Sequence, residues 1–289
     1  MVPKQFEYYA PPTIEEALSL LDRYGDEAKI IAGGQSLVPL MKFRFAAPTA
    51  LVDIYKHIRN NLSYIREDHD GTVSIGALTT HHEIVSSELC GKYCPMLVKA
   101  AGNIGDWQVR NRGTIGGSAC HADPAAHYLP ALMALGAQFL VRGPHGDRII
   151  DVKDFFKGPF TTAVKPNEIL VEIRVPKRDG AKWGYEFVQR RSGDFAVAIA
   201  AVSLDTKGST IRSARIIVGA VTPMPVEMER AEALLAGQKL NADLIKKASA
   251  IVYDEITNPM ADFKASPEYK RQVAATMVER ALLSAMGGV

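Results

Sequence analysis

The apolar and polar positions at the start of the chain follow the spacing of an amphipathic helix. Apolar residues within the segment 14–21 recur at the interval of one helical face, and Thr13 and Glu16 stand where a capping box belongs. Gly25 ends the pattern. The spacing therefore predicts a helix that begins at Thr13 and stops at this glycine.

The next thirty residues have the pattern of a small β-loop-α-β unit. A short apolar run at 29–32 is broken by the glycine pair Gly33-Gly34, a helical stretch follows at 37–45, and a second apolar run covers 51–54. Two buried strands joined by a glycine loop and a helix are the simplest structure with this order.

Further along, strand-like and helical segments alternate irregularly. Strands are predicted at 72–78 and 169–175, and a hairpin pairs 138–141 with 148–152 around Gly143-Pro144-His145-Gly146. Helical spacing covers the segments 81–87, 94–102 and 124–135, with a second glycine-rich loop at 113–117 before the last of them. This region completes the first of two predicted domains.

The polar stretch 177–180 is the predicted domain boundary, which divides the chain into 1–177 and 178–289. Downstream, three antiparallel strands are predicted at 183–190, 195–204 and 211–221. Three helices follow, at 226–235, at 242–255 and from a cap at Ser266 to residue 286. The expected fold class is α+β, with a second domain made of an antiparallel sheet and helices.

Composition and charge narrow the functional classes. The 289 residues are 47% hydrophobic and 23% charged, and the net charge of only +2 predicts no nucleic-acid partner. The three cysteines contain no CxxC pair, which argues against a disulfide framework or an autonomous metal site. Because the N-terminus lacks a secretory apolar region and no run reaches the ~20 apolar residues of a membrane span, we expect a cytoplasmic protein without an integral membrane segment.

Two glycine-rich loops are the strongest chemical signal. Ala32-Gly33-Gly34-Gln35-Ser36 and Gly113-Thr114-Ile115-Gly116-Gly117-Ser118 each offer backbone N–H groups and a hydroxyl to an anion such as a diphosphate. Neither is a GxGxxG or a GxxxxGK[ST] sequence, so a classical dinucleotide fold and a nucleoside-triphosphate loop lose support. Each loop taken alone can equally be an empty tight turn. Two such loops in one domain favour an extended dinucleotide, with one loop binding each end of it.

Other candidate sites fit less well. Both glycine loops lack the last glycine of a GxSxG nucleophile elbow, and His81-His82-Glu83 lacks the second histidine of HExxH. The cluster Cys120-His121-Ala122-Asp123 with His127 could form a nucleophile–base or metal site, although neighbours in sequence do not make a dyad in space. Arg110-Asn111-Arg112 could bind phosphate, and Trp107 and Phe195 could stack on an aromatic cofactor; an exposed loop and core packing are the alternative explanations.

The motifs together resemble one family. The sequences KIIAGGQSLVPLMKFR at 29–44, QVRNRGTIGGSACHADPAA at 108–126, NEILVEIRVP at 167–176 and YEFVQRRSGDFAVAIAAV at 185–202 are similar to the medium, FAD-binding subunit of the molybdenum hydroxylases, of the carbon monoxide dehydrogenase and xanthine dehydrogenase type. The resemblance covers essentially the whole chain. It implies a vanillyl-alcohol-oxidase-like (PCMH-type) FAD-binding domain and a flavoprotein C-terminal domain.

The resemblance also implies an oxidoreductase that acts within a complex. A large molybdopterin subunit would hydroxylate the substrate, and a small subunit with two 2Fe-2S clusters would pass electrons to FAD on this chain, in a dimer of heterotrimers. No side chain here would be a catalytic acid or base, and none would bind a metal. A self-contained flavin oxidase and a flavin-free assembly subunit are the rival hypotheses.

Position by position, the resemblance assigns cofactor contacts to both loops and to later segments. The implied FAD-binding residues are Lys29, Ile30, Ile31, Ala32, Gly33, Gly34, Gln35, Ser36, Ile104, Gly105, Thr114, Gly117, Ser118, Asp123, His127, Leu170 and Gln189. Two of these depart from the family pattern. His127 stands where many relatives have an acidic residue, and Gln189 stands where some have lysine, so the flavin potential and the electron acceptor stay open.

Overall fold

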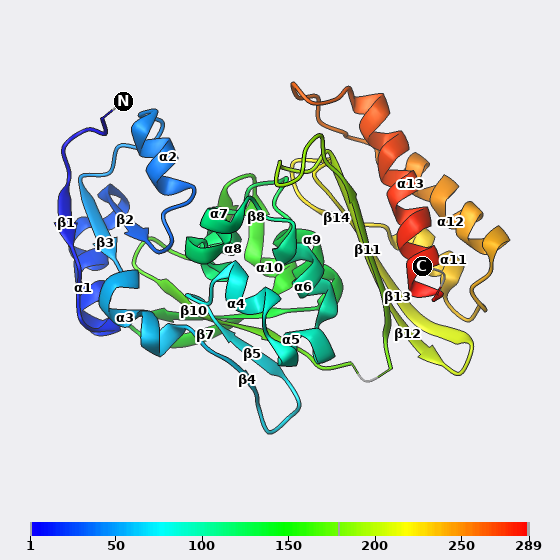
Figure 1. Cartoon of the computed structure of the whole chain (residues 1–289), viewed down its shortest axis with the longest axis horizontal. Coiled ribbons are helices and arrows are strands. Elements are labelled where there is room, and N and C mark those ends of the chain that lie inside the picture. Colours follow the sequence, from blue (N-terminus) through cyan, green and yellow to red (C-terminus); the bar gives the residue numbers. More distant parts are fainter. Residues whose placement is uncertain (1, 179, 288–289) are drawn as a thin grey trace.

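The computed structural model describes residues 2–178 and 180–287, so Asp179, within the predicted boundary stretch, lies outside the described residues. In this part of the chain the strands form a three-stranded, a five-stranded and a four-stranded sheet and a short hairpin. Figure 1 shows the three sheets following one another along the long axis of the molecule, in the order of the sequence. The α+β class predicted from the sequence is confirmed.

The first subdomain is the predicted β-loop-α-β unit with one added strand. Its parallel sheet has the order β1 (Glu7–Tyr9), β3 (Ala50–Asp53), β2 (Ala28–Ile31). Helix α1 (Ile14–Tyr24) begins where Thr13 Oγ1 accepts a hydrogen bond from Glu16 N, and it buries the predicted apolar face. The other helical elements are η1 (Gly25–Glu27), α2 (Leu37–Lys42) and α3 (Tyr55–Leu62).

The second subdomain places its helices on one antiparallel sheet. The strand order is β4 (Ile65–Glu67), β5 (Val73–Gly76), β10 (Ile169–Val175), β6 (Gln138–Gly143), β7 (Gly146–Asp151). The remaining elements are α4 (His81–Val85), α5 (Glu88–Tyr93), α6 (Pro95–Gly102), α7 (Trp107–Arg112), α8 (Ile115–His121), α9 (Tyr128–Leu135), α10 (Val152–Phe155), β8 (Phe156–Gly158) and β9 (Thr161–Thr162).

Two helices of this subdomain differ from the prediction. The glycine pair at 116–117 lies in the first turn of helix α8 and not in a loop, because Thr114 caps the helix and Gly116 lets it approach Ala77, whose Cβ would lie 2.6 Å from a methyl group at that glycine. Helix α9 begins at Tyr128, four residues after the predicted start at Pro124. The Asp123 carboxylate accepts the N–H of Ala125 and forms a turn before the helix.

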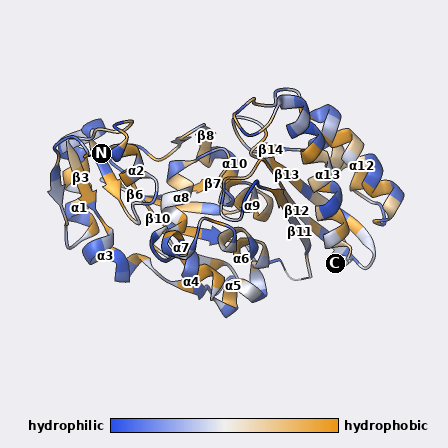
Figure 2. Cartoon of the chain, turned by 45° about the horizontal axis from the view of Figure 1, so that its top comes forward, coloured by the Kyte–Doolittle hydropathy of each residue, from blue (hydrophilic) through white to orange (hydrophobic). Residues whose placement is uncertain are grey.

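The C-terminal region has the three predicted strands and the three predicted helices, but residues 226–227, predicted as the start of the first helix, form a fourth strand instead. Its sheet has the order β11 (Lys182–Val188), β12 (Ala198–Lys207), β13 (Thr210–Gly219), β14 (Val226–Glu227), and helices α11 (Glu229–Leu235), α12 (Ala242–Glu255) and α13 (Pro267–Ala285) pack on one face. Helix α9 of the second subdomain packs against β12 and β13. In Figure 2, α12 and α13 carry both hydrophobic and hydrophilic residues, as expected for helices buried on one side.

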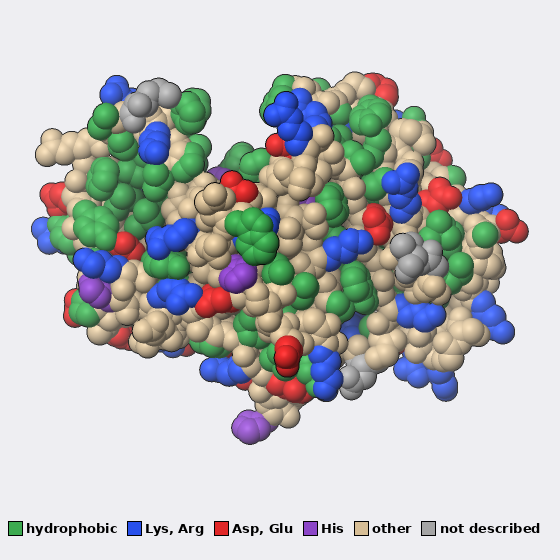
Figure 3. Space-filling model, in the orientation of Figure 1, with side chains coloured by type: hydrophobic (Ala, Val, Ile, Leu, Met, Phe, Trp, Pro, Cys, Tyr) green, Lys and Arg blue, Asp and Glu red, His purple; other side chains and the backbone are tan. Residues whose placement is uncertain are grey.

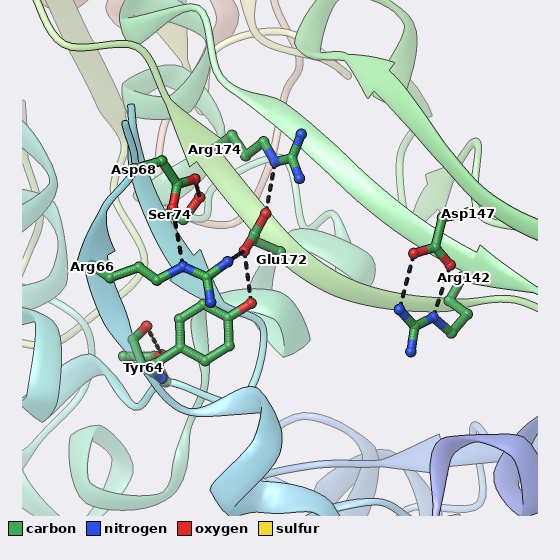
Figure 4. A network of polar contacts seen from close by, with 9 residues as sticks. Tyr64, Arg66, Asp68, Ser74, Arg142, Asp147, Glu172 and Arg174 are labelled. Carbon is green, nitrogen blue, oxygen red and sulfur yellow. Dashed lines mark hydrogen bonds and ion pairs between the residues drawn. The ribbon is translucent and has the colours of Figure 1, made fainter. Parts of the chain in front are cut away.

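A polar network stiffens the five-stranded sheet. Glu172 on β10 is buried, and its carboxylate accepts hydrogen bonds from Tyr64 at 2.7 Å, Arg66 at 3.0 Å and Arg174 at 2.6 Å (Figure 4). A buried carboxylate is stable only when it is paired and hydrogen-bonded. The network therefore ties the segment that enters β4 to the central strand β10. Among the described residues, no helix is long and apolar enough to cross a membrane.

A second buried charge fixes the loop that precedes α13. Lys270 is fully buried, and its Nζ donates to Asp262 Oδ2 at 2.9 Å and to the carbonyl oxygen of Ala220 at 3.1 Å. Burial alone would raise the pKa of Asp262, but hydrogen bonds from Lys270 and from the backbone of Lys264 and Ala265 hold the pKa below its ordinary value. This lysine joins the loop 258–265 to the end of the C-terminal sheet.

We expect Lys270→Ala to lower the free energy of unfolding by about 3 kcal/mol, because it leaves a partly buried carboxylate and a carbonyl oxygen without their partner. Urea unfolding measures this change. Lys247→Ala, at an exposed position on α12, is the control and should change the stability by less than about 0.5 kcal/mol. Equal stability of the two variants would contradict the prediction.

Candidate functional site

A cleft of about 540 Å³ is lined by segments of both N-terminal subdomains and by the loop 193–195 of the C-terminal region. One wall comes from β2 and α2, the floor from α8 and β10, and the opposite wall from the loop 193–195 after β11. Figure 3 shows the corresponding notch between the two lobes of the molecule. The volume is in the range of small-molecule and cofactor sites.

Most of the predicted cofactor residues line this cleft. They are Lys29, Ile30, Ala32, Gly33, Gly34, Gln35, Ser36, Ile104, Gly105, Thr114, Gly117, Ser118, Asp123, His127 and Leu170. Segments as far apart in the sequence as Lys29 and Leu170 thus converge on one cavity. Two predicted residues, Ile31 and Gln189, are not part of the lining.

The two glycine loops are in direct contact. A methyl group at Gly33 would overlap the carbonyl oxygen of Arg112 and would lie 2.9 Å from Gly113 Cα. Gly34 has φ +75°, a conformation that favours glycine, and its nearest neighbour across the loop is Val38. The sequence left the proximity of the loops open. The structure shows that their backbones pack together, and only a residue without a Cβ fits at Gly33.

The second loop is held by its own cap and by the strand behind it. Thr114 Oγ1 accepts a hydrogen bond from Gly117 N at 3.1 Å, and Gly116 N donates to the carbonyl oxygen of Ala77 at 2.9 Å. His81 N donates to the carbonyl oxygen of Gly113 at 3.0 Å. The loop is thereby fixed in the orientation in which Gly117 and Ser118 face the cleft.

His127 is buried at the inner end of the cleft. Its Nδ1 lies 2.8 Å from Tyr185 Oη, while its Nε2 has no hydrogen-bond partner of standard geometry among the described residues. Burial lowers the pKa of His127 to about 4, and a polar contact with Gln189 opposes this shift only in part. A neutral imidazole with one buried ring nitrogen free is suited to a hydroxyl group of a ligand.

Gln189 and Ile31 support the cleft from behind. With its amide oriented to satisfy both partners, Gln189 donates to the carbonyl oxygen of Asp194 at 3.1 Å and accepts from Gly193 N at 3.3 Å. The side chain of Ile31 lies 3.5 Å from the position of a methyl group at Gly34. Both residues therefore position lining segments and do not line the cleft themselves.

The sequence reasoning missed several lining residues that come from other elements. These are Leu37, Leu40, Ile54, Ala77, Leu78, His81, Asn103, Val109, Ala126, Ile169, Gly193 and Asp194. The lining also includes residues that belong to motifs already indicated by the sequence, namely Gly113, Gly116, Cys120, His121 and Phe195. Gly193, at φ +84°, packs against the carbonyl oxygen of Gly105, which lies 2.6 Å from where a methyl group would stand. The dipeptide Ser192-Gly193 is typical of a turn, but the sequence does not show what that turn touches.

The cysteine–histidine cluster also lies in the cleft. Cys120, His121, Asp123 and His127 all line it, but burial raises the pKa of the Cys120 thiol to about 12. A thiol is a nucleophile only as the thiolate. The Cys120 thiol is therefore not the nucleophile of a nucleophile–base pair in this cluster.

Comparison with known proteins identifies this combination of domains. The family described as the FAD binding domain in molybdopterin dehydrogenase matches residues 4–178, and the CO dehydrogenase flavoprotein C-terminal domain matches residues 183–285. The chain belongs to the FAD-binding medium subunits of the molybdenum hydroxylases.

Individual relatives match this medium subunit over nearly its whole length. It is 39% identical to the carbon monoxide dehydrogenase medium chain of Hydrogenophaga pseudoflava, over 99% of this chain and 98% of the relative, and 38% identical to the glyceraldehyde dehydrogenase medium chain of Sulfolobus acidocaldarius, over 97% and 98%. A solved carbon monoxide dehydrogenase from H. pseudoflava superposes with a TM-score of 0.94 at 40% identity, over 100% of this chain and 99% of that one.

Two observations indicate that the cleft of the medium subunit fits FAD. Gly33 and Gly34 form a backbone cradle that a Cβ would fill or strain, and His127 Nε2 is a buried polar atom that needs a partner. The glycine cradle suits the diphosphate of FAD, and His127 Nε2 suits a ribityl hydroxyl. The apolar side chains of Ile104 and Leu170 offer a surface for a flat ring system.

Proposed function

We propose that this subunit is the electron relay of a larger enzyme, in which FAD receives electrons from 2Fe-2S clusters of a small subunit and delivers them to an external acceptor. The substrate would react on a large molybdopterin subunit, in a cytoplasmic dimer of heterotrimers. The observation that carries the proposal is the backbone contact between Gly33 and Arg112, which joins the two glycine loops into one continuous cradle.

The chain's own groups have the following proposed roles. Lys29 to Ser36 with Thr114, Gly117 and Ser118 would hold the diphosphate and the ribityl chain through backbone N–H groups and hydroxyls. Asp123 and His127 would bind ribityl hydroxyls, and Ile104, Gly105 and Leu170 would contact the ring. Ile31 and Gln189 would act from behind the lining. The flavin accepts electrons singly and releases them in pairs, while the protein orients it and excludes water.

The two domains divide the proposed work. Residues 1–177 would form the FAD-binding domain, and residues 178–289 would form a C-terminal domain that closes the cleft through the loop 193–195 and packs on partner subunits. The match of one family to 4–178 and of another to 183–285 supports this division.

A spectrum of the purified complex tests the proposal. We expect visible flavin absorbance, release of FAD on denaturation, and reduction of the flavin by substrate only when the partner subunits are present. A complex without flavin would favour an assembly subunit. Substrate turnover by the isolated chain would instead favour a self-contained oxidase.

A further inference from the structure

His127 and Tyr185 form a buried pair that joins the second subdomain to the C-terminal sheet. His127 precedes helix α9 at the inner end of the cleft, and Tyr185 lies on β11. His127 is 3% exposed, and Tyr185 is fully buried. Phe187, two residues further along β11 and therefore on the same face as Tyr185, meets the imidazole edge-on at a centroid distance of 4.9 Å. One face of β11 thus holds the histidine ring in place.

The Tyr185 hydroxyl makes two contacts with the same histidine. Its Oη donates to the carbonyl oxygen of His127 at 3.1 Å and lies 2.8 Å from Nδ1 of the ring. A hydroxyl has one proton to donate, and a carbonyl oxygen can only accept. If the hydroxyl proton went to Nδ1, the carbonyl oxygen and the hydroxyl oxygen would face each other with no proton between them. The proton therefore belongs to the contact with the carbonyl oxygen.

This direction fixes where the imidazole carries its own proton. Because Tyr185 Oη donates its proton to the carbonyl oxygen, it can only accept from Nδ1, which must then be an N–H group. Burial lowers the pKa of His127 to about 4, so the ring is neutral near pH 7 and has a single N–H. Burial also raises the pKa of the Tyr185 phenol, which keeps the hydroxyl protonated. His127 Nε2 is left with a lone pair and no proton.

We propose that Tyr185 is a positioning residue for the flavin site: it holds His127 in the tautomer whose Nε2 accepts a hydrogen bond, so the ligand group at this point of the cleft must be a donor. The proposal rests on the proposed binding of FAD, whose ribityl hydroxyls are donors, and adds the direction of that hydrogen bond. Among the described residues, Nε2 is buried without a partner of standard geometry. The diphosphate of FAD has only acceptors and would be disfavoured there.

Gln189, another polar side chain in contact with His127, is compatible with this tautomer. Its amide is held by the backbone of Gly193 and Asp194 and has N–H groups to donate. An acceptor at Nε2 gives a ligand hydroxyl the same hydrogen-bond direction as a carboxylate would, but adds no negative charge to the cleft. The C-terminal sheet would thus set the hydrogen-bond direction of a site lined mostly by the N-terminal subdomains.

Nitrogen NMR of the full chain with isotopically labelled histidine measures the tautomer directly. A ring nitrogen without a proton resonates far downfield of an N–H nitrogen, and the spectrum of His127→Gln assigns the His127 signals among the seven histidines. Spectra are recorded at neutral pH without FAD and after FAD is added. Tyr185→Phe removes the hydroxyl and keeps the buried ring. Tyr64→Phe is the matched control, because it removes a hydroxyl that is bonded to Glu172 and does not line the cleft.

We expect wild-type His127 to show one proton-bearing nitrogen, Nδ1, and a downfield Nε2 signal that moves upfield when FAD binds. Tyr185→Phe should mix the two tautomers, because nothing then requires the proton on Nδ1. It should also weaken FAD binding about three- to thirtyfold in a flavin fluorescence titration. Tyr64→Phe should lose stability but keep the wild-type His127 signals and the wild-type affinity for FAD.

A proton on Nε2 in the wild type would overturn the proposal, and this measurement does not depend on the fold of any variant. Unchanged His127 signals in Tyr185→Phe would overturn it as well. An Nε2 signal that does not move while FAD binds would rule out His127 as the acceptor for the ligand. If the wild type binds no FAD at all, the proposed function fails, whereas the spectrum without FAD still decides the tautomer.

Discussion

A Gly33→Ala variant is expected to purify with little or no FAD. Its methyl group would overlap the backbone carbonyl of Arg112, and backbone cannot move aside as a flexible side chain can. The two glycine loops would have to separate, at a cost of at least about 1–3 kcal/mol, and the cradle would no longer be continuous. Flavin absorbance per protein chain, together with FAD released on denaturation, measures the effect.

Two other glycines serve as controls for this result. Gly91→Ala, in helix α5, introduces a methyl group with no atom within 4 Å and should leave flavin content unchanged. Gly34→Ala should have an intermediate effect, because its φ of +75° costs about 1–2 kcal/mol for alanine without driving the loops apart. Full flavin occupancy in Gly33→Ala would mean that the two loops are not held in contact.

Stability is expected to fall steeply between pH 6.5 and pH 4. Burial lowers the pKa of His127 to about 4 and that of His81 to about 3, with Arg110 adding to the effect at His81. Both histidines are neutral in the folded state and take up a proton more readily when unfolded. The contribution of the two neutral histidines to the free energy of unfolding is therefore fully present above pH 6.5 and decreases as the pH falls. At pH 5 each histidine has lowered the free energy of unfolding by about 2 kcal/mol.

Urea unfolding at pH 7.5, 6 and 5 follows this loss. His127→Gln should reduce the loss of stability between pH 7.5 and pH 5 by about 2 kcal/mol, since one of the two buried imidazoles is gone. Burial raises the pKa of Glu232 to about 7, so its protonation opposes part of the loss in both proteins. His69→Gln is the control, because His69 is exposed, and it should reproduce the wild-type curve. A stability that is constant from pH 7.5 to pH 5 would contradict the burial of both rings.

The sequence predicted elements well where one face of a helix or strand is buried over many residues. Strands β10 to β13 and helices α12 and α13 were found within a few residues, because their apolar spacing continues for seven or more positions. Helix α3 was missed, since only Ile58 and Leu62 mark its buried face among polar neighbours. Short elements with two apolar positions give too little periodicity to be recognised.

The residues of the candidate site were likewise predictable only where they form a continuous sequence motif. Contiguous loops with glycine and hydroxyl residues were recognisable, and most residues assigned to them line the cleft. His81 and Asn103 were not, because a buried histidine or a helix-terminal asparagine carries no local signal of what it faces. Contacts such as that of Gly193 with Gly105 depend on the packing of two domains, which no segment of sequence contains.

The cradle and the surface loops around it are built from different kinds of atoms, and this has a consequence for how such subunits can vary. The cradle consists largely of main-chain groups, so a few glycines fix it whatever side chains surround them. Surface loops present side chains, which single substitutions can change without touching the cradle. One redox module can therefore be connected to different protein assemblies by altering its outer contacts alone. Subunits named for carbon monoxide, glyceraldehyde and nicotine enzymes each match this chain over at least 96% of its length.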